Sequence, residues 1–375
     1  MATTIAARGT GGPSARGKNN VDASQREDLA NFISMITRDE TPFMSSIGKT
    51  KATAIFHEWQ TDALATPGNS RIAEGQDYLE PGVTGAQTPP TGGAFNTVGP
   101  NRSRLGNYTQ INGKTIAVSG TRRAVDQAGV ADEYAYQLKK RGTEMRRDIE
   151  QDLIHSFNVS GAFSTPQGNS ARSFGGYQSW INSANTVNLA AGSSGFALPS
   201  EAASGLGTST VTSGTTAGTK GALSLSDIDA VMQKIYEEGG KASKIMVSPK
   251  IRRDFSDLMV TDSGVRRNID MDGKLRQSVD IYMSDFGDLM VVPNYIMGLT
   301  NEVDLRASGS TAVNVDVADF SALIYDPMWF SLATLRPMQE VDVGQRGDST
   351  VGMLVEECTL EVKNPIGCGA IYGLA

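Results

Sequence analysis

The most regular hydrophobic pattern in the chain is a single apolar stripe between residues 130 and 157. Its positions advance mostly in steps of four, as they do along one face of an α-helix. The stripe consists of Val130, Tyr134, Leu138, Met145, Ile149, Leu153 and Phe157. This spacing predicts one helix of roughly 40 Å. Its other faces carry charges of both signs, including Glu150 and Asp152, so we expect a strut whose exposed sides meet neighbouring copies of the chain.

Two extended segments are predicted before this helix, at residues 52–62 and 104–120. In the first segment, Ile55, His57 and Trp59 share one side of a strand. The chain between the segments is rich in glycine and proline, which favours a long open loop. Two strands joined by roughly forty polar residues bury little apolar surface, so we expect an arm that acts outside its own domain.

Regular structure is predicted again only after residues 159–222, which are rich in Gly, Ser, Thr and Ala. Ser226 is the expected N-cap of a helix that stops at Gly239 and Gly240. A buried strand is expected at 244–249 and a further helix at 250–259, followed by strands at 279–287, 288–294, 321–327 and 330–337. A long strand over residues 349–365 comes near the end of the sequence. The order of these elements predicts an α+β fold.

Composition limits the classes of function. The chain has 375 residues and a net charge of −7, enough for two or three compact units. Mild acidity argues against a dedicated nucleic-acid-binding protein, which would carry a concentrated basic field. No apolar run reaches the length of a membrane span, and the first residues lack the apolar region of a secretory signal. We therefore expect synthesis in a cytosol and no membrane partner.

The first residues form a distinct segment. Residues 1–22 contain almost no large apolar side chains, which predicts a disordered arm, and a short helix is expected at 24–35. Arg8, Arg16 and Lys18 face little local acid, so this arm is basic.

Residues suited to catalysis are scarce. Cys358 lies on the apolar face of the last long strand, which predicts a buried free thiol. The only histidines, His57 and His155, are far apart, and no cysteine or histidine cluster has zinc spacing. Two Gly-Lys-Thr tripeptides, at 48–50 and 113–115, lack the first glycine of a phosphate-binding loop. We expect no enzyme and no catalytic, cofactor or metal site.

The order of the parts resembles the major capsid proteins of tailed bacteriophages with the Hong Kong 97-type fold, in the subgroup related to the SU10 major head protein. The local sequence is similar at ETPFMSSIG (40–48), at residues 104–157, at IYEEGGKASKIMVSPKIRRDFSDL (235–258), at VDIYMSDFGDLMVVPN (279–294), at DPMWFSLATLRPMQ (326–339) and at LVEECTLEVKNPIGCGAIYGL (354–374). Residues 159–222 match little beyond Gly-Tyr-Gln-Ser-Trp at 176–180.

This resemblance implies a division of the chain. The expected parts are an N-terminal arm at 1–48, a projecting E-loop at 49–120, a peripheral domain with a spine helix at 121–160, an axial domain at 161–335 with an insertion near 185–222, and a return to the peripheral domain at 336–375.

The resemblance also implies a function. Copies of the chain would assemble as hexamers and pentamers into an icosahedral shell around packaged double-stranded DNA. The implied partners are a separate scaffolding protein, a portal and a decoration protein, and the implied location is the virion after assembly in the bacterial cytoplasm. A nanocompartment shell of the encapsulin type and a surface adhesin or decoration protein are the alternatives.

Candidate contact residues follow from these expectations. Phe56, Trp59 and Tyr108 are large side chains on the E-loop strands, the type that anchors interfaces between subunits. The alternative for Trp59 is packing within its own hairpin. Arg8, Arg16 and Lys18 are candidates to face DNA, and their contacts would be to phosphate. Arg146 and Arg147 are candidates either for DNA or for acidic residues of neighbouring subunits.

Overall fold

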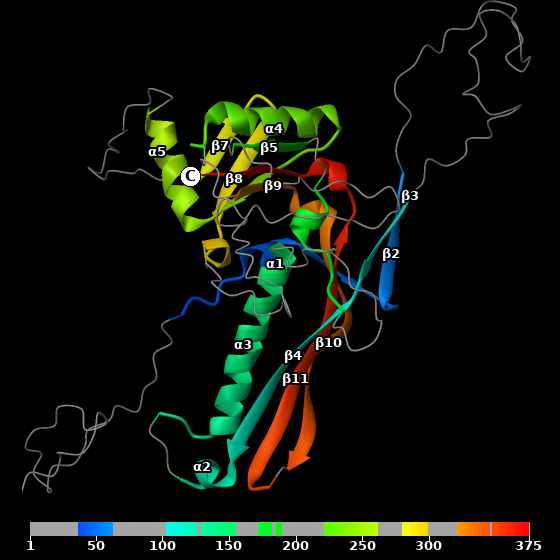
Figure 1. The fold of residues 1–375 in the computed structure, drawn as a ribbon, viewed down its shortest axis with the longest axis vertical. Helices are drawn as coiled ribbons and strands as arrows, with labels where there is room; N and C mark the ends of the chain where they lie inside the picture. The colour runs from blue at the N-terminus through cyan, green and yellow to red at the C-terminus, as the bar shows by residue number, and fades with distance from the viewer. Residues whose placement is uncertain are drawn as a thin grey trace, which may run out of the picture.

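The structure is a computed structural model that describes residues 37–62, 103–125, 129–154, 172–181, 185–189, 221–261, 280–298, 321–345 and 347–374. Its strands form a four-stranded sheet, a six-stranded sheet and a two-stranded hairpin. In Figure 1 the longest helix runs beside the strands of the four-stranded sheet, two further helices lie at the six-stranded sheet, and the hairpin leaves the side of the molecule.

The long-helix lobe consists of α3 and the four-stranded sheet. The sheet has the order β1 (Gly48–Lys51), β10 (Phe330–Gln345), β11 (Ser349–Val362) and β4 (Gln110–Ser119). The predicted helix is confirmed as α3 (Glu133–Ile154), 22 residues long and continuous through Gly142. Met145, Ile149 and Leu153 are buried, and they belong to one core cluster with side chains of β4, β10 and β11. The short helix α2 (Gly120–Ala124) follows β4.

The six-stranded lobe is a mixed sheet. Its order is β5 (Thr186–Asn188), β12 (Gly369–Tyr372), β9 (Ser321–Tyr325), β6 (Lys244–Val247), β8 (Gly287–Pro293) and β7 (Ile281–Ser284). A second core cluster joins this sheet to α4 (Leu225–Glu237) and α5 (Pro249–Thr261). The strands predicted in this part of the chain are confirmed.

The two lobes share one core. The short helix α1 (Pro42–Ser46) and the 3₁₀ turn η1 (Tyr177–Ser179) lie between them. Phe43, at the centre, makes edge-on ring contacts with Tyr177, Tyr325 and Phe330 at centroid distances of 5.3–6.0 Å. Further 3₁₀ turns are η3 (Ile296–Gly298), η4 (Pro327–Trp329) and η5 (Pro365–Gly367).

The predicted N-cap of α4 was wrong by two residues. Ser224, not Ser226, has extended backbone angles, and its hydroxyl accepts from the backbone N–H of Asp227 at 3.3 Å. The Asp227 carboxylate accepts in return from the backbone N–H of Ser224 at 3.1 Å. This reciprocal capping box identifies Ser224 as the N-cap in the structure, although Ser226 also has an aspartate, Asp229, three positions later in the sequence.

The stretch predicted as one projecting loop is divided differently in the structure. Among the described strands of this stretch, β2 (Phe56–Thr61) and β3 (Ser103–Tyr108) pair with each other and form the hairpin. β1 and β4 belong to the four-stranded sheet, where β4 pairs with β11. The reason is apolar burial, since Ile116 and Val118 of β4 pack into the core that also holds α3. The expected boundary at residue 335 falls inside the continuous strand β10.

Several predictions concern residues outside the described ranges. These are the N-terminal helix at 24–35 and the basic residues Arg8, Arg16 and Lys18. Among the described helices, none is long and apolar enough to cross a membrane.

Candidate functional site

The β2–β3 hairpin brings two predicted contact residues together. Phe56 and Tyr108 are directly opposite in the strand register, and their ring centroids are 4.7 Å apart. Phe56 also covers Gly106, where a β-carbon would come within 2.4 Å of the ring. Only glycine fits under that ring without a shift. Both aromatic side chains are half-buried in the single subunit, and their role between subunits stays a prediction.

Trp59 packs against the body of its own subunit. Its contacts reach beyond its own hairpin, which was the alternative considered from the sequence. Its indole N–H donates to the backbone carbonyl of Val362 at 2.8 Å. Its ring lies 5.4 Å from the ring of Trp180. Trp59 therefore anchors the hairpin on β11. Its contact with a neighbouring copy stays a prediction.

Asn107, which the sequence analysis missed, fixes the same root. Its side chain is fully buried, and its amide donates to the carbonyls of Leu360 at 2.8 Å and Gly175 at 3.1 Å. Its side-chain oxygen accepts from the Gly175 N–H at 3.0 Å. The ladder between β4 and β11 ends at Cys358, so side chains of the hairpin bind the next part of β11 instead. A polar residue inside a strand pattern was the only local signal.

A buried carboxylate joins the hairpin root to two other segments. Glu357 accepts from the Thr109 hydroxyl at 2.8 Å and pairs with Arg172 at 2.9 Å and with Arg336 at 2.8 Å. Its neighbour Glu356 points to the other face of the sheet. There burial raises the pKa of Glu356, while the positive charges of Arg146 and Lys49 lower it. Adjacent strand residues point to opposite faces, so these two carboxylates cannot act on one substrate.

Glu150 connects three parts of the chain through hydrogen bonds. The prediction that it lies on an exposed face of the helix was wrong. The side chain is fully buried. One oxygen accepts from the Phe43 N–H at 2.8 Å and from the Asn294 amide at 2.9 Å, and the other accepts from the Met44 N–H at 2.7 Å. Glu150 thereby links α3 to α1 and to the segment after β8.

Asp152 was also assigned to an exposed face, and it is buried as well. Its carboxylate accepts from the Gln110 amide of β4 at 2.6 Å. Gln110 lies at the start of the strand that packs beside α3. This buried carboxylate therefore joins the helix to its sheet and is not available at the surface.

The two adjacent arginines of α3 point in different directions. Arg146 is exposed on the helix. The Arg147 guanidinium lies over the ring of Tyr295, 6.0 Å from its centroid, and is half-buried. Neighbouring residues of a helix do not share a face, so the two predicted contacts cannot form one site.

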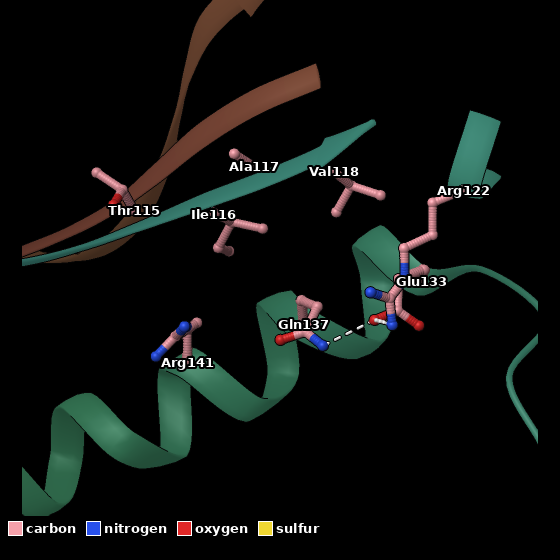
Figure 2. A pocket seen from close by; sticks show the side chains of 8 residues that line it. All are labelled: Thr115, Ile116, Ala117, Val118, Arg122, Glu133, Gln137 and Arg141. Atoms are coloured by element: carbon pink, nitrogen blue, oxygen red, sulfur yellow. Dashed lines mark hydrogen bonds and ion pairs between the residues drawn. The ribbon is translucent and has the colours of Figure 1, made fainter. Parts of the chain in front are cut away.

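A pocket of about 110 Å³ lies between β4, α2 and the first half of α3. Figure 2 shows Glu133 turned toward Arg122 and Gln137 at its rim. Glu133 pairs with Arg122 at 3.2 Å and accepts from Gln137 at 2.8 Å, so its charge is neutralised within the subunit. We assign no ligand to this pocket. Among the described residues, no three His, Cys, Asp or Glu side chains gather as a metal site.

Both cysteines are buried and unpaired, as predicted for Cys358. Burial raises the pKa of the Cys358 and Cys368 thiols, because the charged thiolate is disfavoured away from water. We expect neither thiol to react with a thiol reagent under native conditions and both to react in urea. Boiled samples should run at 39.8 kDa with or without reductant. A ladder of covalent oligomers would contradict this expectation.

Comparison with known proteins identifies similar chains. A model of the SU10 major capsid protein family matches residues 13–375. The major capsid protein of Escherichia phage Phieco32 is 34% identical over 127 residues, which are 34% of this chain and 32% of that protein. The match therefore spans about a third of that relative.

Solved structures resemble almost the whole chain. One from Mycobacterium phage Ogopogo has 11% identity and a TM-score of 0.54, covering 93% of this chain and 96% of its own. The mature capsid of bacteriophage PhiM1 has 10% identity and a TM-score of 0.50, covering 96% and 94%. The SrpI encapsulin of Synechococcus elongatus has 9% identity and a TM-score of 0.50, covering 94% and 92%. At these identities the likeness concerns the fold, which is of the Hong Kong 97 type.

Proposed function

The chain belongs to the SU10 major capsid protein family, and on that premise we propose that it assembles with copies of itself into the closed shell of a virus particle. The observation that carries the proposal is the family match over residues 13–375. We propose hexamers and pentamers as the building units, since closed symmetric assembly multiplies many modest contacts.

The geometry of the subunit supports an assembly role. The β2–β3 hairpin is held at its root by Trp59, Asn107 and Thr109, so its direction relative to the body is fixed. A fixed direction matters for a shell, because an arm that binds a neighbour must leave each copy at the same angle. Phe56 and Tyr108 remain our proposed contacts with that neighbour.

An encapsulin-type compartment is the second candidate, because the SrpI encapsulin has a similar fold. The two readings differ in cargo. We propose packaged double-stranded DNA as the content, and a scaffolding protein, a portal and a decoration protein as further partners. The N-terminal residues Arg8, Arg16 and Lys18 remain proposed DNA contacts. Assembly in the bacterial cytoplasm is part of the same proposal, and the chain would act as a structural protein and not as an enzyme.

Residues 346–348 spell Arg-Gly-Asp, a tripeptide found in adhesion motifs that could suggest the adhesin alternative, and Gly347 and Asp348 are described. Gly347 has a φ of 63° in the connection between β10 and β11, a backbone shape that favours glycine. The glycine therefore has a structural reason to be in a turn, and no adhesive role is needed to explain it.

Electron microscopy of the purified protein tests the proposed function. We expect closed shells of uniform size, and particles from infected cells should retain DNA that resists added nuclease. Soluble subunits that never form shells would contradict the assembly role. Closed shells filled with protein cargo and free of DNA would favour the compartment.

A further inference from the structure

The charges of α3 are separated onto different sides of the helix, which the sequence analysis had described as mixed. Its acidic residues are held by groups on the β4 side or are buried. Glu144 pairs with Arg141 at 2.6 Å, and Asp148 pairs with Lys114 at 2.6 Å. Glu133 is held by Arg122, as Figure 2 shows, and Glu150 and Asp152 are buried.

The opposite side of α3 carries only positive charge. Lys139 and Arg146 are exposed and seven positions apart, which places them on one face of the helix. Neither residue forms an ion pair with another residue in the described part of the chain. This lysine and this arginine are therefore not neutralised by the acids of their own helix.

The edge strand β1 extends this positive surface. Lys49 and Lys51 are exposed and two positions apart, so they share one side of the strand. Lys49 and Arg146 both act on the carboxylate of Glu356, which places strand and helix charges around the same buried acid. We call Lys49, Lys51, Lys139 and Arg146 the basic face.

We propose that the basic face binds the phosphate backbone of nucleic acid. The identity of that nucleic acid rests on the proposed function, in which it is the packaged double-stranded DNA. Interfaces between proteins depend on large apolar or aromatic anchors, whereas contacts to phosphate need only lysine and arginine. The large apolar side chains that are exposed in the described residues include none on α3 or β1. The subunit has a net charge of −7, so this surface is a local exception to its overall charge.

Such binding is independent of base sequence and strongly dependent on salt. Each lysine or arginine that neutralises a phosphate releases counterions, and the logarithm of the association constant falls with the logarithm of salt by about 0.9 per contact. The predicted interaction is therefore measurable at low salt and weak at high salt.

The test compares two triple variants of the full chain by fluorescence anisotropy with a short DNA duplex of random sequence. Lys49→Gln/Lys139→Gln/Arg146→Gln removes three charges from the basic face. Lys241→Gln/Arg253→Gln/Lys363→Gln removes three exposed charges elsewhere. We expect the first variant to bind at least about tenfold more weakly at low salt, with a salt slope smaller by about 2–3. The control variant should match the wild type.

Two outcomes would overturn the proposal. One is unchanged affinity and salt slope in the basic-face variant. The other is retained DNA binding with loss of shell closure in electron microscopy, which would make the basic face a contact between subunits. Failure of the wild type to form shells would instead reject the proposed function, because the DNA measurement is made on unassembled subunits. Melting curves of both variants show whether each is folded.

Discussion

The Glu150→Gln variant should lose about 2–4 kcal/mol of unfolding free energy. Three N–H groups donate to the Glu150 carboxylate, and the glutamine side chain would turn its own N–H₂ group toward one of them, which would then have no acceptor. The affected donors belong to Phe43, Met44 and Asn294, which lie in different parts of the chain. The variant should therefore loosen the junction of α1, α3 and the six-stranded lobe together. Urea unfolding of the unassembled subunit measures the loss.

A matched control lies on the same helix. Glu144→Gln removes a carboxylate that is partly exposed and paired with Arg141, and it should cost less than about 1 kcal/mol. Equal losses in the two variants would contradict the role assigned to Glu150.

The pH dependence gives a second check on Glu150. Burial raises its pKa, and the hydrogen bonds from Met44, Phe43 and Asn294 act against that shift. A folded-state pKa above the unfolded value of about 4.3 means that this group stabilises the fold most at low pH. Its contribution is lost as the pH rises through the folded-state pKa. Glutamine does not titrate, so the difference in unfolding free energy between wild type and Glu150→Gln should become smaller as the pH rises. A difference that grows with pH would contradict the raised pKa.

The Asn107→Ala variant should lose about 2–4 kcal/mol and should also fail to close regular shells. Removing the amide leaves the carbonyls of Leu360 and Gly175, and the Gly175 N–H, without the partners they have now. The hairpin would then leave the body at a variable angle. Electron microscopy should show open or irregular particles from a subunit whose circular dichroism remains close to that of the wild type.

The control for this second variant is Asn112→Ala on the adjoining strand. Asn112 is half-buried and contacts Gln110 and the Cys358 sulfur. We expect a smaller loss of stability and normal shells. Regular shells from Asn107→Ala, at normal yield, would show that the hairpin root does not set the geometry of assembly.

The sequence predicted the parts of the fold that depend on local pattern. The apolar stripe of α3 gave the buried residues Met145, Ile149 and Leu153, because a helix turns at a fixed rate. The same reasoning placed Glu150 on an exposed face. Its burial comes from α1 and from Asn294, which are distant in sequence and invisible to a periodic pattern.

The remaining differences also have non-local causes. β4 could not be separated from the hairpin by its own residues, since its partner β11 comes near the end of the sequence. The only local sign of Asn107 is a polar residue inside a strand pattern, and its role depends on carbonyls of β11 and on Gly175, which are distant in sequence. The N-cap of α4 is the exception, because its cause is local. Ser224 and Ser226 each have an aspartate three positions later, so the capping pattern alone does not choose between them.

The core shared by the two lobes has a consequence for genetics. Phe43, Ile149, Tyr325 and Leu360 come from different elements and belong to one buried cluster. Damage to any of them weakens the same cooperative unit. Temperature-sensitive alleles at these positions should therefore form one class, in which soluble subunit disappears at the restrictive temperature. Alleles that yield abundant but misshapen particles should map instead to the hairpin root and to exposed surfaces, so the two phenotypes separate folding from assembly along a single gene.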